Sequence, residues 1–483
     1  MTQNEGINKF QELQQLFQTS ADIKFSTDLF NDQVVHFIIC EKMVDTKLLH
    51  EVVVPRIQFF IQKKGDDFSC DQLPEQLHLP ELKELTDLQE AEVNVYKGFL
   101  LLYFEKEQRL FQVNIINRPN RNPEETAAEV TIKGPRDNFI EDLNTNIALV
   151  RKRLPTSSLA VEKMQIGNRS KTDLAILYFE DVADQEILKS IKQKLSAIDT
   201  DIIVSGDLVV SHIVRNNSIF PQTDYTGRAD YAVQALARGR FIIMVEGIAY
   251  ANIVPVNLLL LIKTAEDNEA PTAVSSAARL IRIASLLIST FLPGLWLALT
   301  TFHPSELPFM LLATVVQANI GLPLPSALEM LLMIFLFELL REAGLRLPSI
   351  IGSTIGIVGG LIIGDAATRA GITSPAMIVI IATSTIATYT LVNQSLVTSV
   401  NIIRLYTIVC SAFFGLFGYF IALYLLLIYL ANMKTFGLPY LNIGAELSWE
   451  NISKSIFRRH SEGYEKRPKA LNPKDTTRSK EPK

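Results

Sequence analysis

The stretch IASLLISTFLPGLWLALTTF, residues Ile283–Phe302, decides the fold because it carries no charge. A bilayer core of about 30 Å needs about 20 apolar residues in a helix, so this stretch fits one membrane span, and Pro293-Gly294 should kink it. The charge-poor composition continues to Met433: the 151 residues from Ile283 to Met433 include nine charged ones, about 6%, against about 25% in a typical soluble protein. The average over all 483 residues, 48% hydrophobic and 20% charged, hides this contrast. A purely soluble protein is therefore excluded.

More apolar segments follow the first span. Leu307–Leu328 has no charge, but Pro308, Gly321, Pro323 and Pro325 interrupt it, which favours a broken or re-entrant segment over a straight span. We expect an α-helical transmembrane domain over residues 279–433 with four to six membrane segments. Its other predicted helices are Ser326–Gly344, Leu347–Ala367, Ser374–Val392 and Arg404–Met433.

The residues before this domain predict an α/β cytoplasmic domain of two mixed α/β subdomains, residues 1–116 and 127–265. Asn117–Thr126, with two Pro and three Asn, is the predicted linker. The predicted strands and helices are Val34–Ile39, Thr46–Gln62, Phe99–Phe104, Leu110–Ile116, Glu141–Leu154, Leu174–Phe179, Asp184–Ile198 and Thr226–Arg238.

Two apolar runs, Phe241–Val245 and Tyr250–Val254, allow two interpretations. Together with Leu258–Ile262 they could form a first membrane span. Their β-branched residues and the Glu246-Gly247 turn favour a buried hairpin instead.

Charge is distributed unevenly along the chain. The net charge of −5 divides into about −9 before the apolar region, −1 within it and +5 in a basic cytoplasmic tail, residues 434–483. An acidic front domain argues against nucleic acid as a partner. The positive-inside rule places the tail in the cytoplasm, and the N-terminus shows no export signal. We therefore expect both termini in the cytoplasm and an even number of crossings. The tail could contact anionic membrane lipid or be solvated.

Sequence motifs of catalysis are absent. The chain has no phosphate loop, HExxH or GxSxG motif, and its six His do not pair at ligand spacing. Three cysteines give neither a disulfide framework nor a thiolate zinc site. We expect no enzyme activity, no cofactor and no metal site. The basic run Arg151-Lys152-Arg153 is typical of a solvated helix C-terminus.

A glycine ladder is the strongest local pattern. Its members recur every four residues within IGSTIGIVGGLIIGDAA and would form one ridge without side chains, which lets another helix approach closely. Tight packing alone would account for the ridge. Alternatively the helix lines an oligomeric pore, with Val358 and Ile362 as an apolar constriction and Asp365 at a mouth, where acidic rings favour cations. The ladder consists of Gly352, Gly356, Gly360 and Gly364.

Charges inside the apolar region form a second pattern, because an intramembrane carboxylate normally pairs or faces water. Glu338 can meet Arg341 at i+3, and Asp365 can meet Arg369 at i+4. Glu329 has no opposite charge within one helical turn, which makes it a candidate for an ion pathway or a subunit contact.

Several motifs resemble a known family, the GerA-type A subunits of bacterial spore germinant receptors. They lie in one order between about Glu129 and Leu441. The first 115 residues match only in size and position. The motifs are GPRDNFIEDLNTNIALVRKRL (Gly134–Leu154), FPQTDYTGRAD (Phe220–Asp230), the GRFIIMVEG hairpin, ELLREAGLRLP (Glu338–Pro348), GIVGGLIIGDAA (Gly356–Ala367) and FGLPYL (Phe436–Leu441).

This resemblance implies a multi-pass protein of the spore inner membrane that senses nutrients and starts germination. It implies a homo-oligomer around a cation-conducting pore lined by the Gly352–Asp365 helix. The implied partners are a transporter-like B subunit, which binds the nutrient, and a lipid-anchored C subunit. Two other functions stay open: a non-conducting membrane scaffold or signalling subunit of the same complex, and a secondary transporter built on broken helices.

Overall fold

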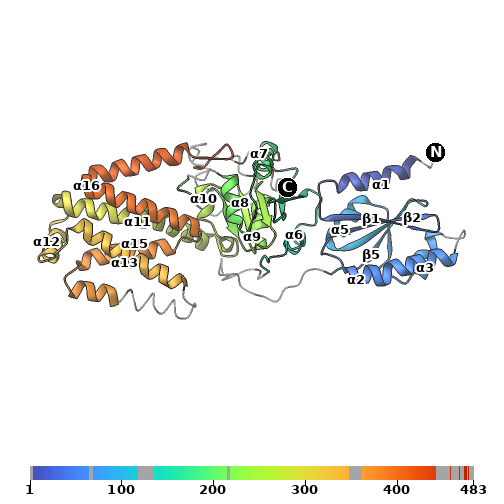
Figure 1. Ribbon diagram of the computed structural model, residues 1–483, viewed down its shortest axis with the longest axis horizontal. Coiled ribbons are helices and arrows are strands. Elements are labelled where there is room, and N and C mark those ends of the chain that lie inside the picture. The colour runs from blue at the N-terminus through green and yellow to red at the C-terminus, as the bar shows by residue number, and fades with distance from the viewer. Residues whose placement is uncertain are drawn as a thin grey trace.

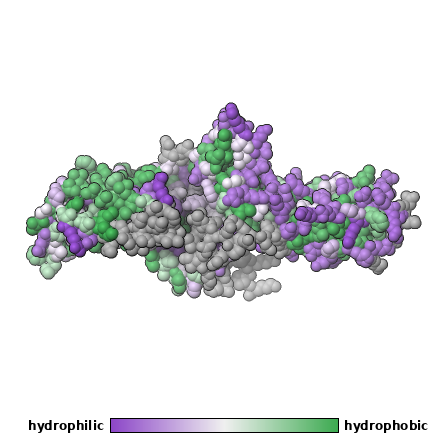
Figure 2. Space-filling view, turned by 60° about the horizontal axis from the view of Figure 1, so that its bottom comes forward, coloured by the Kyte–Doolittle hydropathy of each residue, from purple (hydrophilic) through white to green (hydrophobic). Residues whose placement is uncertain are grey.

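The computed structural model describes residues 4–64, 69–117, 135, 137–214, 218–346, 360 and 362–441, with tail positions 457, 467, 471, 473–475 and 477. Two α/β units and a bundle of helices follow one another along the long axis of the molecule (Figure 1). Hydrophobic residues gather over the helices and hydrophilic residues over the N-terminal unit (Figure 2). The prediction of an α/β front and a helical domain behind it is confirmed.

The first α/β unit, residues 4–117, contains an antiparallel sheet of order β1-β2-β4-β5-β3. Successive side chains of a strand point to opposite faces, so Leu102 on β4 belongs to one buried cluster and Leu101 to the other. Helix α3 covers the first face, and α1 and α5 cover the second. The elements are α1 (Asn4–Leu16), β1 (Ile23–Phe30), β2 (Gln33–Cys40), α2 (Thr46–Leu48), a π-helix (Leu49–Val53), α3 (Val54–Lys64), a 3₁₀ turn (Cys70–Gln72), α4 (Leu73–Gln76), β3 (Lys83–Leu85), α5 (Leu88–Lys97), β4 (Phe99–Phe104) and β5 (Arg109–Asn114).

The second α/β unit, residues 137–268, has a sheet of order β6-β7-β9-β10-β8. Helices α6 and α9 cover one face, and α7 and α8 cover the other. The elements are α6 (Leu143–Arg151), β6 (Leu159–Ile166), β7 (Thr172–Phe179), α7 (Gln185–Ser196), α8 (Gly206–Ile213), β8 (Asp224–Thr226), α9 (Ala229–Ala237), β9 (Phe241–Val245), β10 (Ala251–Val254), α10 (Leu258–Leu261) and a 3₁₀ turn (Ala265–Asn268).

The two apolar runs at 241–254 form the predicted hairpin and not a membrane span. Strands β9 and β10 pair antiparallel, with Met244 opposite Ala251. Gly247 has a φ of 81° in the turn between them, a conformation that glycine adopts without steric cost. The pair lies inside the sheet, with β7 on one side and β8 on the other.

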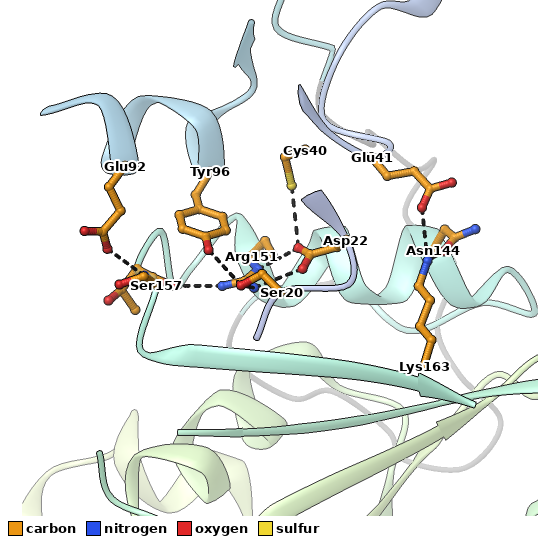
Figure 3. A network of polar contacts seen from close by, with 11 residues as sticks. Ser20, Asp22, Cys40, Glu41, Glu92, Tyr96, Asn144, Arg151, Ser157 and Lys163 are labelled. Carbon is orange, nitrogen blue, oxygen red and sulfur yellow. Dashed lines mark hydrogen bonds and ion pairs between the residues drawn. The ribbon is translucent and has the colours of Figure 1, made fainter. Parts of the chain in front are cut away.

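A buried ion pair joins the two α/β units (Figure 3). The Arg151 guanidinium donates to both carboxylate oxygens of Asp22, at 2.7 and 3.0 Å, and to Ser20 Oγ at 3.1 Å. It also lies 4.1 Å from the centroid of the Tyr96 ring, whose hydroxyl bonds Ser20. Burial alone would lower the pKa of Arg151, but the Asp22 carboxylate outweighs it and raises that pKa.

This arrangement corrects the expectation that the Arg151-Lys152-Arg153 run is solvated. Arg151 is fully buried, because it reaches the loop before β1 instead of water. Backbone bonds extend the same seam: Ala21 N donates to Val161 O, and Val161 N donates to Thr19 O, each at 2.9 Å. The seam therefore holds one α/β unit rigidly against the edge strand β6 of the other.

The helical domain begins with α11, which starts earlier than the predicted span and runs through Pro293. The predicted break after Leu307 is confirmed, since α12 ends at Asn319 and α13 begins at Ser326. Much of the predicted Leu347–Ala367 helix lies outside the described residues, although 362–369 are helical. The elements are α11 (Thr272–Phe302), a 3₁₀ turn (Pro304–Glu306), α12 (Phe309–Asn319), α13 (Ser326–Arg346), α15 (Pro375–Tyr389), α16 (Gln394–Asn432), β11 (Lys434–Thr435) and β12 (Leu438–Pro439).

Helix α16 folds back on itself at Gly415, a turn that the sequence pattern does not predict. Gly415 has a φ of 59° and a ψ of −139°. A Cβ there would lie 2.8 Å from the Cβ of Phe302, at the end of α11, so only glycine fits this turn. Two arms result, 394–414 and 416–432, which meet at the outer end of the bundle (Figure 1). At about 1.5 Å per residue the arms are roughly 30 and 25 Å long.

Two described helices, α11 and α16, are long and apolar enough to cross a membrane, and α12 and α15 are shorter apolar helices. This is fewer than the four to six predicted segments. Helix α13 is long enough but carries Glu329, Glu338, Arg341 and Glu342, which lowers its mean hydropathy.

The first prediction concerns the seam between the α/β units. Arg151→Met would leave the Asp22 carboxylate buried without its partner, and breaking a buried pair in this way costs about 3–5 kcal/mol. We expect hydrogen exchange of the peptides around Asp22 and β6 to accelerate accordingly in the full-length protein.

Lys42→Met is the matched control, because it removes the half-exposed Lys42–Asp142 pair (3.1 Å) across the same seam. Such pairs contribute about 0–1 kcal/mol. Equal acceleration in both variants would contradict the special role of Arg151.

Candidate functional site

Two glycines of the predicted ladder lie within the described residues, and both face helices of the same chain. A Cβ on Gly360 would lie 4.0 Å from the Phe337 ring on α13, and a Cβ on Gly364 would lie 3.7 Å from Ile378 on α15. The described part of the ridge therefore packs inside the chain. Gly352, Gly356 and Val358 lie outside the described residues.

On the opposite face of 362–369, the described side chains are exposed. Ile362 and Gly364 are two residues apart, about 200° around the helix, and the Ile362 side chain is 59% exposed. Asp365 and Arg369 lie on the same open face and form the predicted ion pair, with 2.9 Å between Nε and Oδ2. Both side chains are more than half exposed. Ile362 and Asp365, two of the three residues predicted to line a pore, thus share one exposed face of the described segment 362–369.

Glu329, in contrast, is enclosed. It is 1% exposed, and one carboxylate oxygen accepts bonds from Thr373 Oγ1 and Ser374 N, each at 2.7 Å. Sequence spacing correctly shows that Glu329 has no opposite charge on its own helix. Its partners come from the loop before α15, so this carboxylate ties the first turn of α13 to the start of α15.

A second polar cluster lies between α13, α15 and α16. Glu338 forms the predicted ion pair with Arg341 and also accepts a bond from Asn401 Nδ2 at 3.4 Å. Arg404 is 4% exposed and approaches Ser384 Oγ at 3.4 Å. Within the described residues, Arg341 Nε and Asn401 Oδ1 have no hydrogen-bond partner. The cluster has one more arginine than carboxylate.

The joint between the second α/β unit and the helices centres on Asp224, which sequence reasoning did not single out. Its Oδ1 accepts from Asn393 Nδ2 at 2.7 Å and from Tyr225 N at 3.0 Å, and its Oδ2 accepts from Tyr231 Oη at 3.0 Å. Burial raises the pKa of Asp224 to about 6, although these donors act to lower it. Asn393 caps the first turn of α16. The carboxylate therefore fixes the sheet edge to that helix.

Both arms of α16 contact the same short loop. Ser399 Oγ donates to Ile219 O at 2.6 Å, and Ile219 N donates to Tyr429 Oη at 3.0 Å. Tyr440 Oη donates to Pro221 O at 2.9 Å. The motif FPQTDYTGRAD and the ending FGLPYL, noted above as family-like, thus meet at one joint.

No group of three His, Cys, Asp or Glu that could hold a metal ion occurs in the described part of the chain. The residues that the structure brings together are acids, amides and arginines that join helices. Their chemistry suits positioning and charge compensation.

Known proteins resemble most of the chain. The family model described as Bacillus/Clostridium GerA spore germination protein matches residues 11–470. Spore germination protein XA of Bacillus anthracis is 39% identical over 445 residues, which cover 92% of this chain and 90% of that protein. Spore germination protein A1 of Bacillus subtilis (strain 168) is 30% identical over 466 residues, 95% of this chain and 93% of that protein.

The chain is also similar to a membrane protein and to a solved domain structure. The uncharacterized membrane protein YfkQ of Bacillus subtilis (strain 168) is 32% identical over 375 residues, 77% of this chain and 73% of that protein. The crystal structure of the N-terminal domain of the A subunit of the Bacillus megaterium spore germinant receptor GerK3 has 20% identity and a TM-score of 0.40, covering 50% of this chain and 92% of that chain.

The second prediction concerns the pH dependence of the joint. Because the pKa of Asp224 is about 6 in the folded protein and 3.8 normally, its protonated form is favoured by folding. The contribution of Asp224 to the free energy of unfolding is fully present below pH 3.8. It is lost as the pH rises through about 6, and the free energy of unfolding falls by about 3 kcal/mol. Asp224→Asn should remove this pH dependence. The stability of the variant relative to wild type should therefore increase from pH 4 to pH 7.

Thermal unfolding of the full-length protein across that pH range measures the difference. Gln193→Asn, at an exposed position of α7, removes no ionisable group and serves as control, so its difference should not change with pH. A constant difference for Asp224→Asn would contradict the buried, titrating carboxylate.

Proposed function

Since the chain belongs to the GerA family of spore germination proteins, we propose that it is the A subunit of a nutrient germinant receptor in the spore inner membrane. In this proposal several copies surround a ligand-gated cation channel whose opening triggers germination.

The open face of 362–369 carries the proposal. An exposed carboxylate inside a membrane domain is costly unless it faces water or a partner. Asp365 is exposed together with Ile362, while Gly364 on the other side is packed on α15. The described residues of one chain do not close around this face, so in this proposal further copies complete a water-filled path along it. Ile362 would then form an apolar ring and Asp365 an acidic ring beside it.

The path of the chain supports the proposed orientation. Helix α11 starts at the front domain, where Arg279 binds Asp267, and ends beside Gly415 at the far end. Both arms of α16 return to the loop at Ile219. The helical domain therefore starts and finishes against the α/β units, as an even number of crossings would require, with both termini in the cytoplasm.

The joint supports gating from the cytoplasmic side. Asp224 and the Ile219 loop couple the second α/β unit directly to both arms of α16. Helix α16 contacts α11 and α15, and α15 packs on 362–369. A shift of the front domain would thus reach the pore face through packed helices. A transporter-like B subunit and a lipid-anchored C subunit, as the family resemblance implies, would deliver the nutrient signal.

A non-conducting scaffold is the second candidate. The packing of Gly360 and Gly364 inside the chain would serve helix association equally well without any pore. A secondary transporter is the weaker alternative, because the break between α12 and α13 is the one feature that favours it. Ion flux separates these functions.

The third prediction tests the constriction. Ile362→Ala should widen the apolar ring and let water and ions pass without nutrient. We expect potassium leak from liposomes that contain the assembled receptor to rise about tenfold or more, which corresponds to a barrier lowered by about 1.4 kcal/mol. Spores that carry the variant should lose dormancy.

The matched control is Ile386→Ala, where the side chain is 64% exposed but belongs to α15 and not to the segment 362–369. It should leave the flux unchanged. Wild-type flux in Ile362→Ala would contradict the pore and favour the scaffold.

The fourth prediction concerns ion selectivity. Asp365→Asn should lower the preference for cations over anions, because it removes the acidic ring. Arg369→Gln should raise that preference, since it frees the carboxylate from its i+4 partner. Reversal potentials in a salt gradient measure both changes. If neither variant shifts the reversal potential, Asp365 does not face the ion path.

A further inference from the structure

Cationic side chains concentrate where the second α/β unit meets the start of α11. Arg238 and Arg240 come from the end of α9 and the start of β9, and Lys263 follows α10. Arg279 and Arg282 lie on the first turns of α11. The cytoplasmic end of the bundle thus gathers five cations, opposite the carboxylates of Asp224 and Asp267. Arg228 stands apart, since it pairs with Asp230 and Glu266.

Asp267 is already shared between two arginines. Its carboxylate accepts from Arg279 Nε at 2.9 Å and from Arg282 Nη1 at 2.9 Å. It is 3% exposed and also caps its own turn through Thr264. One carboxylate charge thus faces two arginine charges, so one positive charge stays uncompensated by Asp267. Its oxygens already accept these hydrogen bonds and are not bonded to Lys263.

Arg240 is buried with an unused donor. The side chain is 4% exposed, and Nη1 donates to Pro255 O. Its Nε has no hydrogen-bond partner among the residues that the structure describes. Asp224 acts on it electrostatically, but the bonds of that carboxylate go to Tyr231, Tyr225 and Asn393.

Lys263 lacks a counter-ion. Its ammonium makes no ion pair and no side-chain hydrogen bond within the described residues. Burial lowers the pKa of Lys263 well below its ordinary value, and the nearby Arg238, Arg279 and Arg240 lower it further, whereas Asp267 raises it. Buried like charges repel strongly, so the described residues leave this site with an excess of positive charge.

The position of this cluster indicates what compensates it. Arg279 and Arg282 directly precede the apolar run that begins at Ile283, so the cluster lies at the level where a membrane presents its headgroups. Anionic lipids of the cytoplasmic leaflet attract such cations, and a phosphate oxygen can accept from both arginine and lysine.

We propose that Arg240 and Lys263, supported by Arg279, bind the phosphate of an anionic phospholipid and so fasten the joint to the membrane. This proposal requires that α11 lies in the bilayer, as in the proposed function, but not that the chain conducts ions. A non-conducting scaffold would bind the lipid equally well.

The bound phosphate would stabilise the charged form of Lys263. Protonation and lipid binding are then coupled, and the affinity should fall as the pH rises. In Lys263→Arg the site keeps its charge at every pH, so binding should persist without this pH dependence.

The test is lipid binding to the full-length protein in detergent, followed by thermal stabilisation and by native mass spectrometry. The probes are short-chain phosphatidylglycerol, short-chain phosphatidylcholine and inorganic phosphate. We expect phosphatidylglycerol to bind, and Lys263→Gln and Arg240→Gln each to weaken it about fivefold or more. Lys189→Gln, an exposed lysine on α7, is the matched control and should bind like wild type.

Several results would overturn the proposal. Equal binding of phosphatidylcholine would show a site for acyl chains and not for the anionic headgroup. Inorganic phosphate that binds as well as the lipid would identify a soluble anion as the occupant. Unchanged affinity in Lys263→Gln would place the lipid elsewhere, and lost binding in Lys263→Arg would show that shape, not charge, holds the ligand.

Discussion

The bonds of Asp224 are the interaction on which the arrangement of the molecule depends. A carboxylate in an apolar setting is unfavourable unless donors surround it, and here donors come from both sides of a domain boundary, Tyr231 within the α/β unit and Asn393 at the start of α16. A different docking of the helices that still covered Asp224 would remove the Asn393 donor and leave this group buried and partly unpaired. The cost of that state holds the helical domain in one orientation on the front domain.

The seam between the α/β units and the joint between the second unit and the helices each contain a buried carboxylate, but the two carboxylates have different partners. Arg151 and Asp22 are a matched ion pair that is closed to solvent, and each charge has its counter-charge within 3.0 Å. Asp224 has only neutral donors in direct contact, so its charge stays costly and its pKa lies near 6. The seam between the two α/β units is therefore a rigid contact. The joint at Asp224 is less stable above a pH of about 6, because its carboxylate is then charged without an opposite charge in direct contact.

Patterns of local spacing predicted much of the fold. The hairpin at 241–254, the break before α13 and the pairs Glu338–Arg341 and Asp365–Arg369 depend on neighbours within a few residues, and all are present. The contacts that the sequence does not predict join residues that are far apart along the chain. Arg151 meets Asp22 from 129 residues away, and Asp224 meets Asn393 from 169 residues away. The turn at Gly415 exists because Phe302 leaves no space for a side chain, which no periodicity reveals.

The charged residues of the apolar region finally divide into two groups by their surroundings. Glu329 and the Glu338–Arg341 pair have their partners inside the chain, where they fix α13 against α15 and α16. Among the described residues, Asp365 and Arg369 form an ion pair with each other, and both side chains are more than half exposed. A membrane domain loses free energy by keeping such an exposed pair unless water or another copy meets it. The first group therefore explains how the bundle holds together, and the second group is the part of the bundle that its own described helices leave exposed.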